Sequence, residues 1–450
     1  MRATIRSPGD LPPAAAVSGR RPVLSISPVG PAPLYSVLRN PFTPTEIASH
    51  PADFFGRGDE LRTLERSLIQ GSVAIQGPVG IGKSSLLARG LAAMEGFDSD
   101  HTARSVVAVG DRDTDTIDKA ARLILHSLVS IDETQKRVKF KIGTFFERES
   151  AEITRNYVEG RHTENLKRLV EREYVNSLLG NDKYLILAID EADKCPVPIA
   201  RLVRSIVTHT QQQGVKRVRF LLAGVRPFFQ RMVDEDPGVS RFFYKTISLE
   251  QLPTEEAREL IEAKLAQAAQ WAEEDGVSLT VEPSVIVRVV ALSGGHPHLL
   301  QLLGSHLIEH EDDDPDGIID ARDLANSLRR ICYEDRARVY DSALHELEVY
   351  GRLEVVERLL DLASAGFPTR IDRKAAATIA TAEEIHWLTE HNIIVAHSES
   401  TYGLVDEFLR IRMIMDKEES DAERARSEQK IIDRLYRRGR LGEALYDEDA

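Results

Sequence analysis

The stretch Gly77-Pro78-Val79-Gly80-Ile81-Gly82-Lys83-Ser84 has the form G-x-x-x-x-G-K-S, which is the pattern of the phosphate-binding P-loop. A short apolar run at 73–76 precedes it and is typical of a buried strand, whereas the Leu- and Ala-rich run at 85–94 favours a helix. Glycines let successive backbone N–H groups turn toward one phosphate, and the following helix adds the positive end of its dipole. We therefore predict a phosphate-binding loop between a strand and a helix.

The residue types at the end of this loop predict individual roles. Lys83 would contact the β- and γ-phosphates, and the Ser84 hydroxyl would ligate Mg²⁺. The predicted ligand-binding residues of the loop are Gly77, Pro78, Val79, Gly80, Ile81, Gly82, Lys83, Ser84 and Ser85.

A second motif is the continuous apolar run 184–189, which is followed by the carboxylates Asp190 and Glu191. Such a run is typical of a strand that is buried on both faces of a parallel sheet. In P-loop ATPases the first carboxylate completes the Mg²⁺ coordination through water, and the second polarises the attacking water. We predict these roles for Asp190 and Glu191; the alternative is an Asp-Glu pair that only caps a helix.

Composition narrows the class of protein. The chain has 450 residues, 42% of them hydrophobic and 29% charged, which is ordinary for a globular protein with several domains. Its formal charge of -14 argues against nucleic-acid binding by the whole chain. The two cysteines, Cys195 and Cys332, form neither a disulfide framework nor a zinc pattern, so we expect a cytoplasmic protein. No apolar run approaches the roughly 18 residues of a membrane span.

The pattern along the chain predicts a sheet domain first. Residues 1–40 are rich in Pro, Ala, Ser and Arg and are predicted to be a disordered tail. Further strands are expected at 105–109, 218–223 and 246–249. Residues 41–252 would then form a doubly wound α/β domain of five strands with helices between them.

The remaining chain is predicted to be mainly helical. Residues 253–338 show successive helices and no strand signals, so we expect a small all-helical domain. Residues 339–416 combine helices with a hairpin around the Ser-Glu-Ser turn at 398–400, which is a winged-helix pattern. Residues 417–450 are expected to be a charged, helical tail.

The helix that would read DNA in such a winged helix opens with a capping box at Thr381 and is acidic. It carries Glu383, Glu384, His386 and Glu390, with no Lys or Arg. This composition disfavours reading of the major groove and favours a protein-contact or spacer module. We expect nucleic-acid binding to be weak or absent.

Three weaker signals leave alternatives open. The turn that contains Gly56 and Arg57 could lay its backbone against a purine base or could only cap a helix. Arg226, just after the strand at 218–223, could sense the γ-phosphate or lie on the surface. The basic alternation within 131–160 could contact nucleic acid, although a solvated strand face is favoured.

With these motifs placed, the chain from about 40 to 415 resembles AAA+ ATPases of the origin-recognition-like group and the neighbouring STAND NTPases. The resemblance rests on the order of Asn40-Pro41-Phe42, Phe55-Gly56-Arg57, the P-loop, the acidic strand, a helical lid and a winged helix. Gly295-His296-Pro297 looks like the Gly-x-Pro motif of STAND proteins, which implies that Pro297 lies near the adenine of bound ATP. Ser240-Arg241-Phe242 looks like the AAA+ box that carries the arginine finger, which implies catalysis by Arg241 in a neighbouring subunit. The alternative is that Arg241 pairs with local acids such as Asp234 or Asp236.

Two departures from the family pattern concern hydrolysis. Many AAA+ lids carry a sensor Arg where this chain has His296-Pro297-His298, and the end of the fourth strand at 224–226 has no clear Asn or Thr. The resemblance implies an ATP- and Mg²⁺-dependent switch that works as a homo-oligomer on an unidentified protein client. The alternatives are a non-hydrolysing ATP/ADP-binding adaptor and a DNA-dependent ATPase in replication, transposition or defence. The intact Lys83, Ser84, Asp190 and Glu191 favour hydrolysis.

Overall fold

The computed structural model describes residues 38–95, 103–132, 137–140, 160–172, 175–176, 184–313, 316–363, 367–396 and 400–418. The predictions for the N-terminal tail up to 37, for most of 131–160 and for the C-terminal tail from 419 concern residues outside these ranges.

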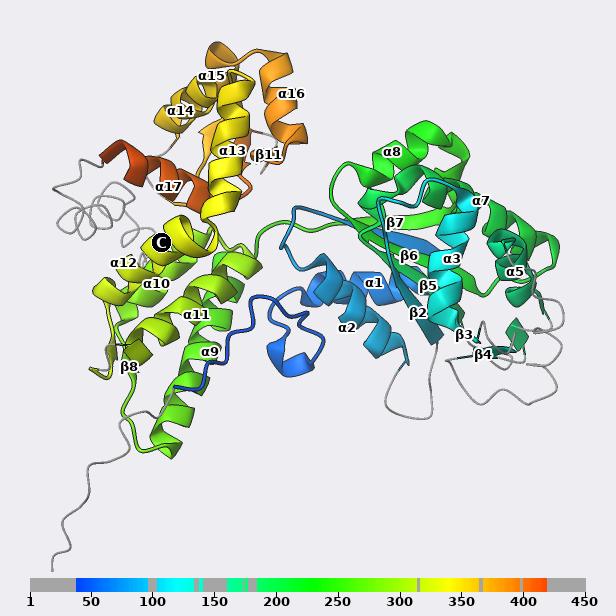
Figure 1. Cartoon of the computed structure of the whole chain (residues 1–450), viewed down its shortest axis with the longest axis horizontal. Helices are drawn as coiled ribbons and strands as arrows, with labels where there is room; N and C mark the ends of the chain where they lie inside the picture. The colour runs from blue at the N-terminus through cyan, green and yellow to red at the C-terminus, as the bar shows by residue number, and fades with distance from the viewer. Residues whose placement is uncertain are drawn as a thin grey trace, which may run out of the picture. The chain divides into compact units, whose positions relative to one another are not determined.

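A parallel sheet forms the first part of the described chain (Figure 1). Its strands lie in the order β2 (Ala103–Val109), β5 (Tyr184–Asp190), β6 (Val218–Gly224), β1 (Ser72–Gln76) and β7 (Phe243–Ser248). Every neighbouring pair is parallel. The chain therefore places β1, which precedes the P-loop, inside the sheet between β6 and β7. This confirms the predicted doubly wound α/β fold.

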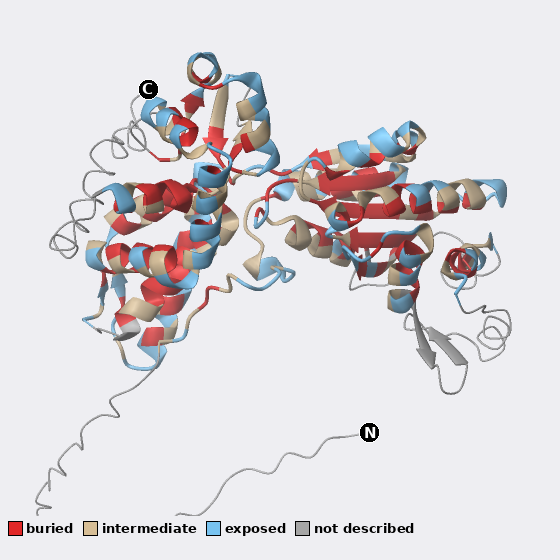
Figure 2. Ribbon diagram, turned by 45° about the horizontal axis from the view of Figure 1, so that its top comes forward, coloured by how far each residue is buried: buried red, intermediate tan, exposed pale blue. Residues whose placement is uncertain are grey.

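Helices cover both faces of this sheet, as the alternation of side chains along a strand requires. In β5, Leu185, Leu187 and Ile189 pack into one core, whereas Ile186 and Ala188 pack into the core on the opposite face. Figure 2 shows the strands as the most buried layer. One face carries α1 (Gly58–Gln70) and α2 (Lys83–Glu95), and the other carries α3 (Ile117–Leu128), α5 (His162–Leu169), α7 (Pro196–Gln212) and α8 (Phe228–Glu235).

Short elements connect these helices and strands. They are η1 (Pro51–Asp53), η2 (Ala192–Lys194), η3 (Pro237–Phe242) and the antiparallel pair β3 (Val129–Asp132) and β4 (Arg137–Phe140). The β3–β4 pair lies within the segment whose sequence pattern was ambiguous, and it supports the strand interpretation there.

A helical region follows the sheet and confirms the predicted lid. It consists of α9 (Thr254–Glu274), α10 (Pro283–Ser293), α11 (Pro297–Asp313), α12 (Ala321–Arg330) and η4 (Ile331–Asp335). The prediction that no strand interrupts it is wrong, because β8 (Thr280–Val281) pairs with β9 (Ile318–Ile319). Strands of two residues are too short to show the alternation that identifies a strand in a sequence.

The winged-helix fold is also confirmed. Its three-stranded antiparallel sheet has the order β10 (Ile371–Asp372), β12 (Thr401–Leu404) and β11 (Ile394–Ala396). The helices of this region are α13 (Ala337–Val349), α14 (Leu353–Leu362), α15 (Arg373–Ile379), α16 (Ala382–Glu390) and α17 (Glu407–Glu418). The capping box forms as expected, since the Glu384 N–H donates to Thr381 Oγ1 at 3.2 Å.

A continuous apolar core joins the lid and the winged helix, running from Leu260 in α9 to Leu388 in α16. The two regions therefore bury their apolar side chains against each other as well as internally. The domain boundaries that we placed after 252, 338 and 416 stay predictions.

Candidate nucleotide-binding site

The P-loop connects β1 to α2, and α2 begins at Lys83. Gly80 and Gly82 have positive φ values of 74° and 95°, which glycine adopts without the steric cost of a side chain. The Lys83 ammonium donates to the carbonyl oxygens of Gly77 at 3.1 Å and Pro78 at 2.6 Å. The loop therefore folds around its own lysine, with the predicted strand–loop–helix geometry.

Burial lowers the pKa of Lys83, while the carboxylates of Asp193, Asp190 and Glu191 act in the opposite direction. The structure thus brings the two predicted motifs together, because all three carboxylates interact with the P-loop lysine. Carboxylates and an ammonium group within electrostatic range of each other can bind a cation and a phosphate at neighbouring positions.

The carboxylates follow β5 directly and are held by local geometry. Asp190 Oδ1 accepts the Glu191 N–H at 2.9 Å, and Glu191 has a left-handed φ of 52°. The Glu191 carboxylate forms an ion pair with Lys194. Asp193 was not predicted; its Oδ1 accepts the Val225 N–H at 2.9 Å and links the end of β5 to the end of β6. The sequence feature that could have identified Asp193 is its position as the third carboxylate within residues 190–193, directly after the buried strand.

A cavity of about 230 Å³ adjoins the P-loop. Of the predicted ligand-binding residues it brings together the P-loop residues from Gly80 onward, Arg57 and Pro297, whereas Gly56 and residues 77–79 lie outside its lining. Its lining consists of Thr43, Pro44, Thr45, Glu46, Ile47, Ala48, Asp53, Phe54, Phe55, Arg57, Gly80, Ile81, Gly82, Lys83, Ser84, Ser85, Leu252, Leu260, Pro297, His298 and Gln301. The lining combines P-loop residues with apolar side chains such as Phe54, Phe55 and Leu260, a mixture that suits a ligand with a charged part and an apolar part.

The Gly56–Arg57 turn is fixed against the chain that leads into the lid. Arg57 is buried, pairs with Glu60 at 3.0 Å and donates to the carbonyl oxygen of Glu250. A Cβ on Gly56 would lie 2.4 Å from Glu256 Oε2. Arg57 also occupies the position before α1, so the turn caps a helix and lines the cavity at the same time.

An N-terminal segment, residues 43–48, forms one wall of the cavity and was not predicted. Its Ala48 N–H donates to Ser85 Oγ at 3.1 Å, which joins it to the P-loop helix. Its Pro44 carbonyl lies 3.0 Å from His298 Nδ1, which joins it to the lid. From the sequence, Asn40-Pro41-Phe42 was expected only to begin the folded part of the chain, and no ligand-binding role was predicted for the residues that follow it.

The lid reaches the P-loop through His296, whose Nε2 lies 3.0 Å from the Val79 carbonyl oxygen. Burial lowers the pKa of His296 to about 3, so the ring is neutral at physiological pH. Because a carbonyl only accepts, Nε2 carries the proton and donates. No described residue hydrogen-bonds to Nδ1.

Gly80→Ala should destabilise the protein because the lid lies close to the loop. A Cβ at Gly80 would lie 2.9 Å from His296 Cε1 and 3.0 Å from His298 Cβ. Gly214 has a similar φ of 71° with nothing within 4 Å, so Gly214→Ala adds only the backbone strain. We expect Gly80→Ala to lower the free energy of unfolding by about 1–3 kcal/mol more than Gly214→Ala, as overpacking does. Urea denaturation measures the free energy of unfolding of both variants. Equal decreases would show that the lid does not pack against the P-loop at Gly80.

Arg241 and Arg226 lie outside the cavity lining. Arg241 is an exposed residue at the end of η3, with its guanidinium 5.0 Å from the Phe242 ring. It forms no ion pair with any described residue. Arg226 Nη2 lies 3.8 Å from Glu250 Oε1.

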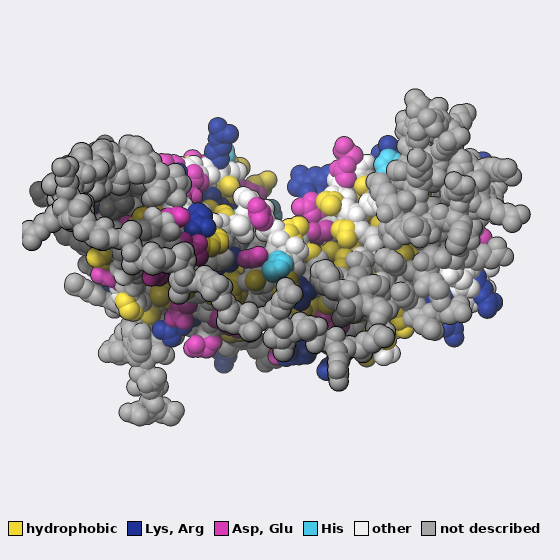
Figure 3. Space-filling view, turned by 90° about the horizontal axis from the view of Figure 1, so that it is seen from below, with side chains coloured by type: hydrophobic (Ala, Val, Ile, Leu, Met, Phe, Trp, Pro, Cys, Tyr) yellow, Lys and Arg dark blue, Asp and Glu magenta, His cyan; other side chains and the backbone are white. Residues whose placement is uncertain are grey.

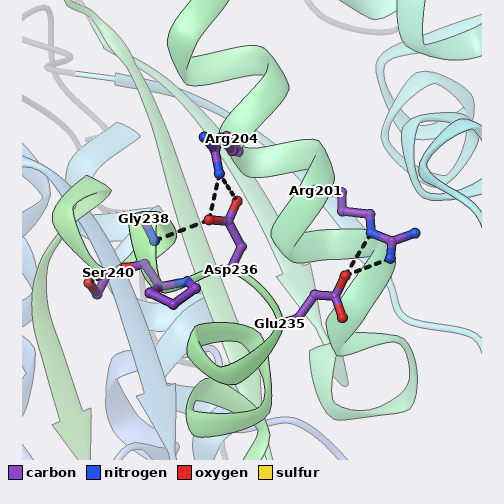
Figure 4. A network of polar contacts seen from close by, with 7 residues as sticks. Arg201, Arg204, Glu235, Asp236, Gly238 and Ser240 are labelled. Atoms are coloured by element: carbon purple, nitrogen blue, oxygen red, sulfur yellow. Dashed lines mark hydrogen bonds and ion pairs between the residues drawn. The ribbon is translucent and has the colours of Figure 1, made fainter.

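Asp236 and Asp234, two acids close in sequence to Arg241, form hydrogen bonds with other residues. Arg204 Nη1 donates to both oxygens of Asp236, at 2.6 and 2.8 Å, and Asp236 accepts the Gly238 N–H (Figure 4). Asp234 accepts from Gln230. Asp236 is therefore paired with Arg204 first, although the Arg241 charge also helps to lower the pKa of Asp236.

A parallel sheet of this strand order, with a P-loop after β1 and two carboxylates after β5, defines a P-loop NTPase of the AAA+ type. The family model of the novel STAND NTPase 1 matches residues 42–314. The chain belongs to this family. A comparison with curated protein sequences finds no match.

Two solved structures share the fold. The Walker-type ATPase of Pyrococcus abyssi is 17% identical, with a TM-score of 0.52, and the match covers 82% of this chain and 99% of that one. The ORC2 protein of Aeropyrum pernix, solved in ADPNP–ADP complexes, is 15% identical, with a TM-score of 0.51 and coverage of 89% and 98%. The family match confirms the resemblance to STAND NTPases, and the two structures show that the chain shares the fold of an origin-recognition protein and a Walker-type ATPase.

Proposed function

We propose that the protein binds ATP with Mg²⁺ and hydrolyses it to ADP and phosphate, which drives a conformational or oligomeric switch that acts on a protein partner. The observation that carries this proposal is the half-buried Lys83 of the P-loop, which lines the cavity and whose charge is stabilised by the carboxylates of Asp193, Asp190 and Glu191. Family membership and the fold shared with nucleotide-bound ORC2 support it.

The residues present fit these ligands. Ser84 would offer a direct oxygen ligand to Mg²⁺ and Asp190 would hold the ion through water, with phosphate and water as the other ligands. Among the described residues, no cluster of three His, Cys, Asp or Glu side chains forms a separate metal cage. Arg57, Pro297 and the 43–48 segment would surround the base. Glu191 would orient the attacking water after its carboxylate leaves Lys194.

Lys83→Ala should lower ATP affinity at least tenfold, because it removes a charge-assisted hydrogen bond to phosphate in a buried site. Titration with a fluorescent ATP analogue measures this. Lys216→Ala, which changes an exposed lysine of the same domain, is the matched control and should bind as wild type does. A folded Lys83→Ala protein with undiminished affinity would overturn the P-loop assignment.

A non-hydrolysing ATP/ADP-binding adaptor is the second candidate function. It is favoured by the ion pair that occupies Glu191 and by the absence of a sensor Arg at His296-Pro297-His298. The two functions differ in turnover: the adaptor binds ATP with the affinity of a P-loop protein and releases no phosphate in a malachite-green assay.

The partner predictions extend this proposal. We propose a homo-oligomer in which Arg241 of one subunit reaches the nucleotide of the next. That nucleic acid binds weakly or not at all stays a prediction. Among the coloured residues of the face in Figure 3, acidic and basic side chains are interspersed, and a continuous basic surface would be needed to bind a nucleic-acid backbone. Among the described residues, no helix has the length and apolar character needed to cross a membrane.

A further inference from the structure

The Gly294–Pro297 turn packs closely against two other parts of the chain. The Leu252 N–H donates to the Gly295 carbonyl at 2.8 Å, and a Cβ at Gly295 would lie 2.3 Å from Leu252 O. A Cβ at Gly294 would lie 3.1 Å from Glu407 Cγ. Glu407 is itself buried and accepts the Thr369 N–H at 2.8 Å. The backbone that carries His296 therefore has little freedom to move relative to the sheet domain.

The imidazole of His296 is held as firmly as its backbone. The side chain is buried, its pKa of about 3 keeps it neutral, and its hydrogen bond runs to Val79. Gly80 lies directly against the ring, where a Cβ would be 2.9 Å from Cε1. The lid thus contacts the Val79–Gly80 peptide through both a hydrogen bond and close packing.

The geometry of the Val79–Gly80 peptide sets the direction of the Gly80 N–H. The Val79–Gly80 bond is trans, because the cis bonds of the described chain are those before Pro227 and Pro368. In a planar trans peptide the C=O and N–H point in opposite directions. Holding the Val79 oxygen on the lid side therefore turns the Gly80 N–H to the other side, within the loop whose amides bind phosphate.

We propose that His296 is a positioning residue for phosphate binding: its hydrogen bond to Val79 orients the Gly80 N–H toward the phosphates of a bound nucleotide. This inference rests on the proposed nucleotide function. It assigns the lid a role in preparing the P-loop that involves no direct contact between His296 and the nucleotide.

Two substitutions separate the hydrogen bond from the volume of the side chain. In His296→Gln the amide nitrogen reaches about as far as Nε2 and can still donate to Val79. In His296→Asn the amide ends near the position of Nδ1 and cannot reach. His296→Phe is a second donor-free variant, with a ring of similar size. His306→Asn is the matched control, since His306 is a buried histidine of α11 that pairs with Asp335 at 2.9 Å and lies outside the cavity lining.

The probes are ADP and adenosine, measured by calorimetry or by competition with a fluorescent ADP analogue. We expect His296→Asn and His296→Phe to weaken ADP binding by about tenfold, the loss for one hydrogen bond whose partner is left unpaired. Adenosine, which has no phosphate, should bind these variants as it binds wild type. His296→Gln should restore ADP affinity, and His306→Asn should leave it unchanged.

Three outcomes would overturn the proposal. The first is unchanged ADP affinity in folded His296→Asn and His296→Phe. The second is an equal loss for ADP and adenosine, and the third is an equal loss in His306→Asn; both would indicate a general structural role. If wild type binds no ADP, the nucleotide function itself fails, and this result is distinct from wild-type binding that His296 does not influence.

Discussion

Arg241→Ala protein is expected to bind ATP with wild-type affinity and to hydrolyse it about 10³ times more slowly. This factor is the increase in kcat that an arginine finger supplied in trans contributes. The physical reason lies in the position of Arg241. It is exposed at the end of η3 and lies outside the cavity lining, so we expect its guanidinium to contact the nucleotide of a neighbouring subunit and not its own. A guanidinium stabilises charge on the transferring phosphoryl group.

A mixing experiment tests the supply in trans. Arg241→Ala offers an intact pocket and Lys83→Ala offers an intact Arg241, so a mixture should hydrolyse more ATP than either variant alone. Wild-type turnover per subunit should also rise with protein concentration. Arg231→Ala, which changes an exposed arginine of α8, is the control and should keep wild-type turnover. Concentration-independent hydrolysis without rescue would identify the protein as a monomeric switch.

Glu191→Gln should retain ATP binding and lose about a hundredfold or more in turnover, because an amide cannot act as the base that activates water. The Glu191 side chain is about half exposed, so it is open to a water molecule once it leaves its ion pair with Lys194. Release of phosphate under single-turnover conditions measures the loss, and binding of a fluorescent ATP analogue checks affinity.

The matched control for this change is Glu164→Gln. Glu164 forms an exposed ion pair with Lys167 three residues later, as Glu191 does with Lys194. Its replacement should leave turnover unchanged. If Glu191→Gln hydrolyses ATP at the wild-type rate, another group activates the water, and Asp193 is the next candidate because it also interacts with Lys83.

The features that could be predicted from sequence are those whose residues are contiguous. The P-loop, the strand that ends in Asp190 and the capping box at Thr381 each depend on a few neighbouring residues with a fixed spacing. The alternation between strands and helices then implied a parallel sheet, since parallel strands need crossover connections. The prediction that the lid is all-helical was wrong at β8 and β9, because strands of two residues are too short to show an alternating pattern.

The arrangement around the cavity beside the P-loop depends on contacts between distant residues. His296 and Val79 are 217 positions apart, and His298 and Pro44 are 254 apart. No spacing rule links such pairs, because they meet only after the lid has packed its apolar face and the 43–48 segment has crossed to it. The amino-acid sequence by itself determined the phosphate-binding loop and its acidic partners, which are local patterns. The tertiary structure alone decided that a lid histidine holds the loop, since packing of the whole chain sets that distance.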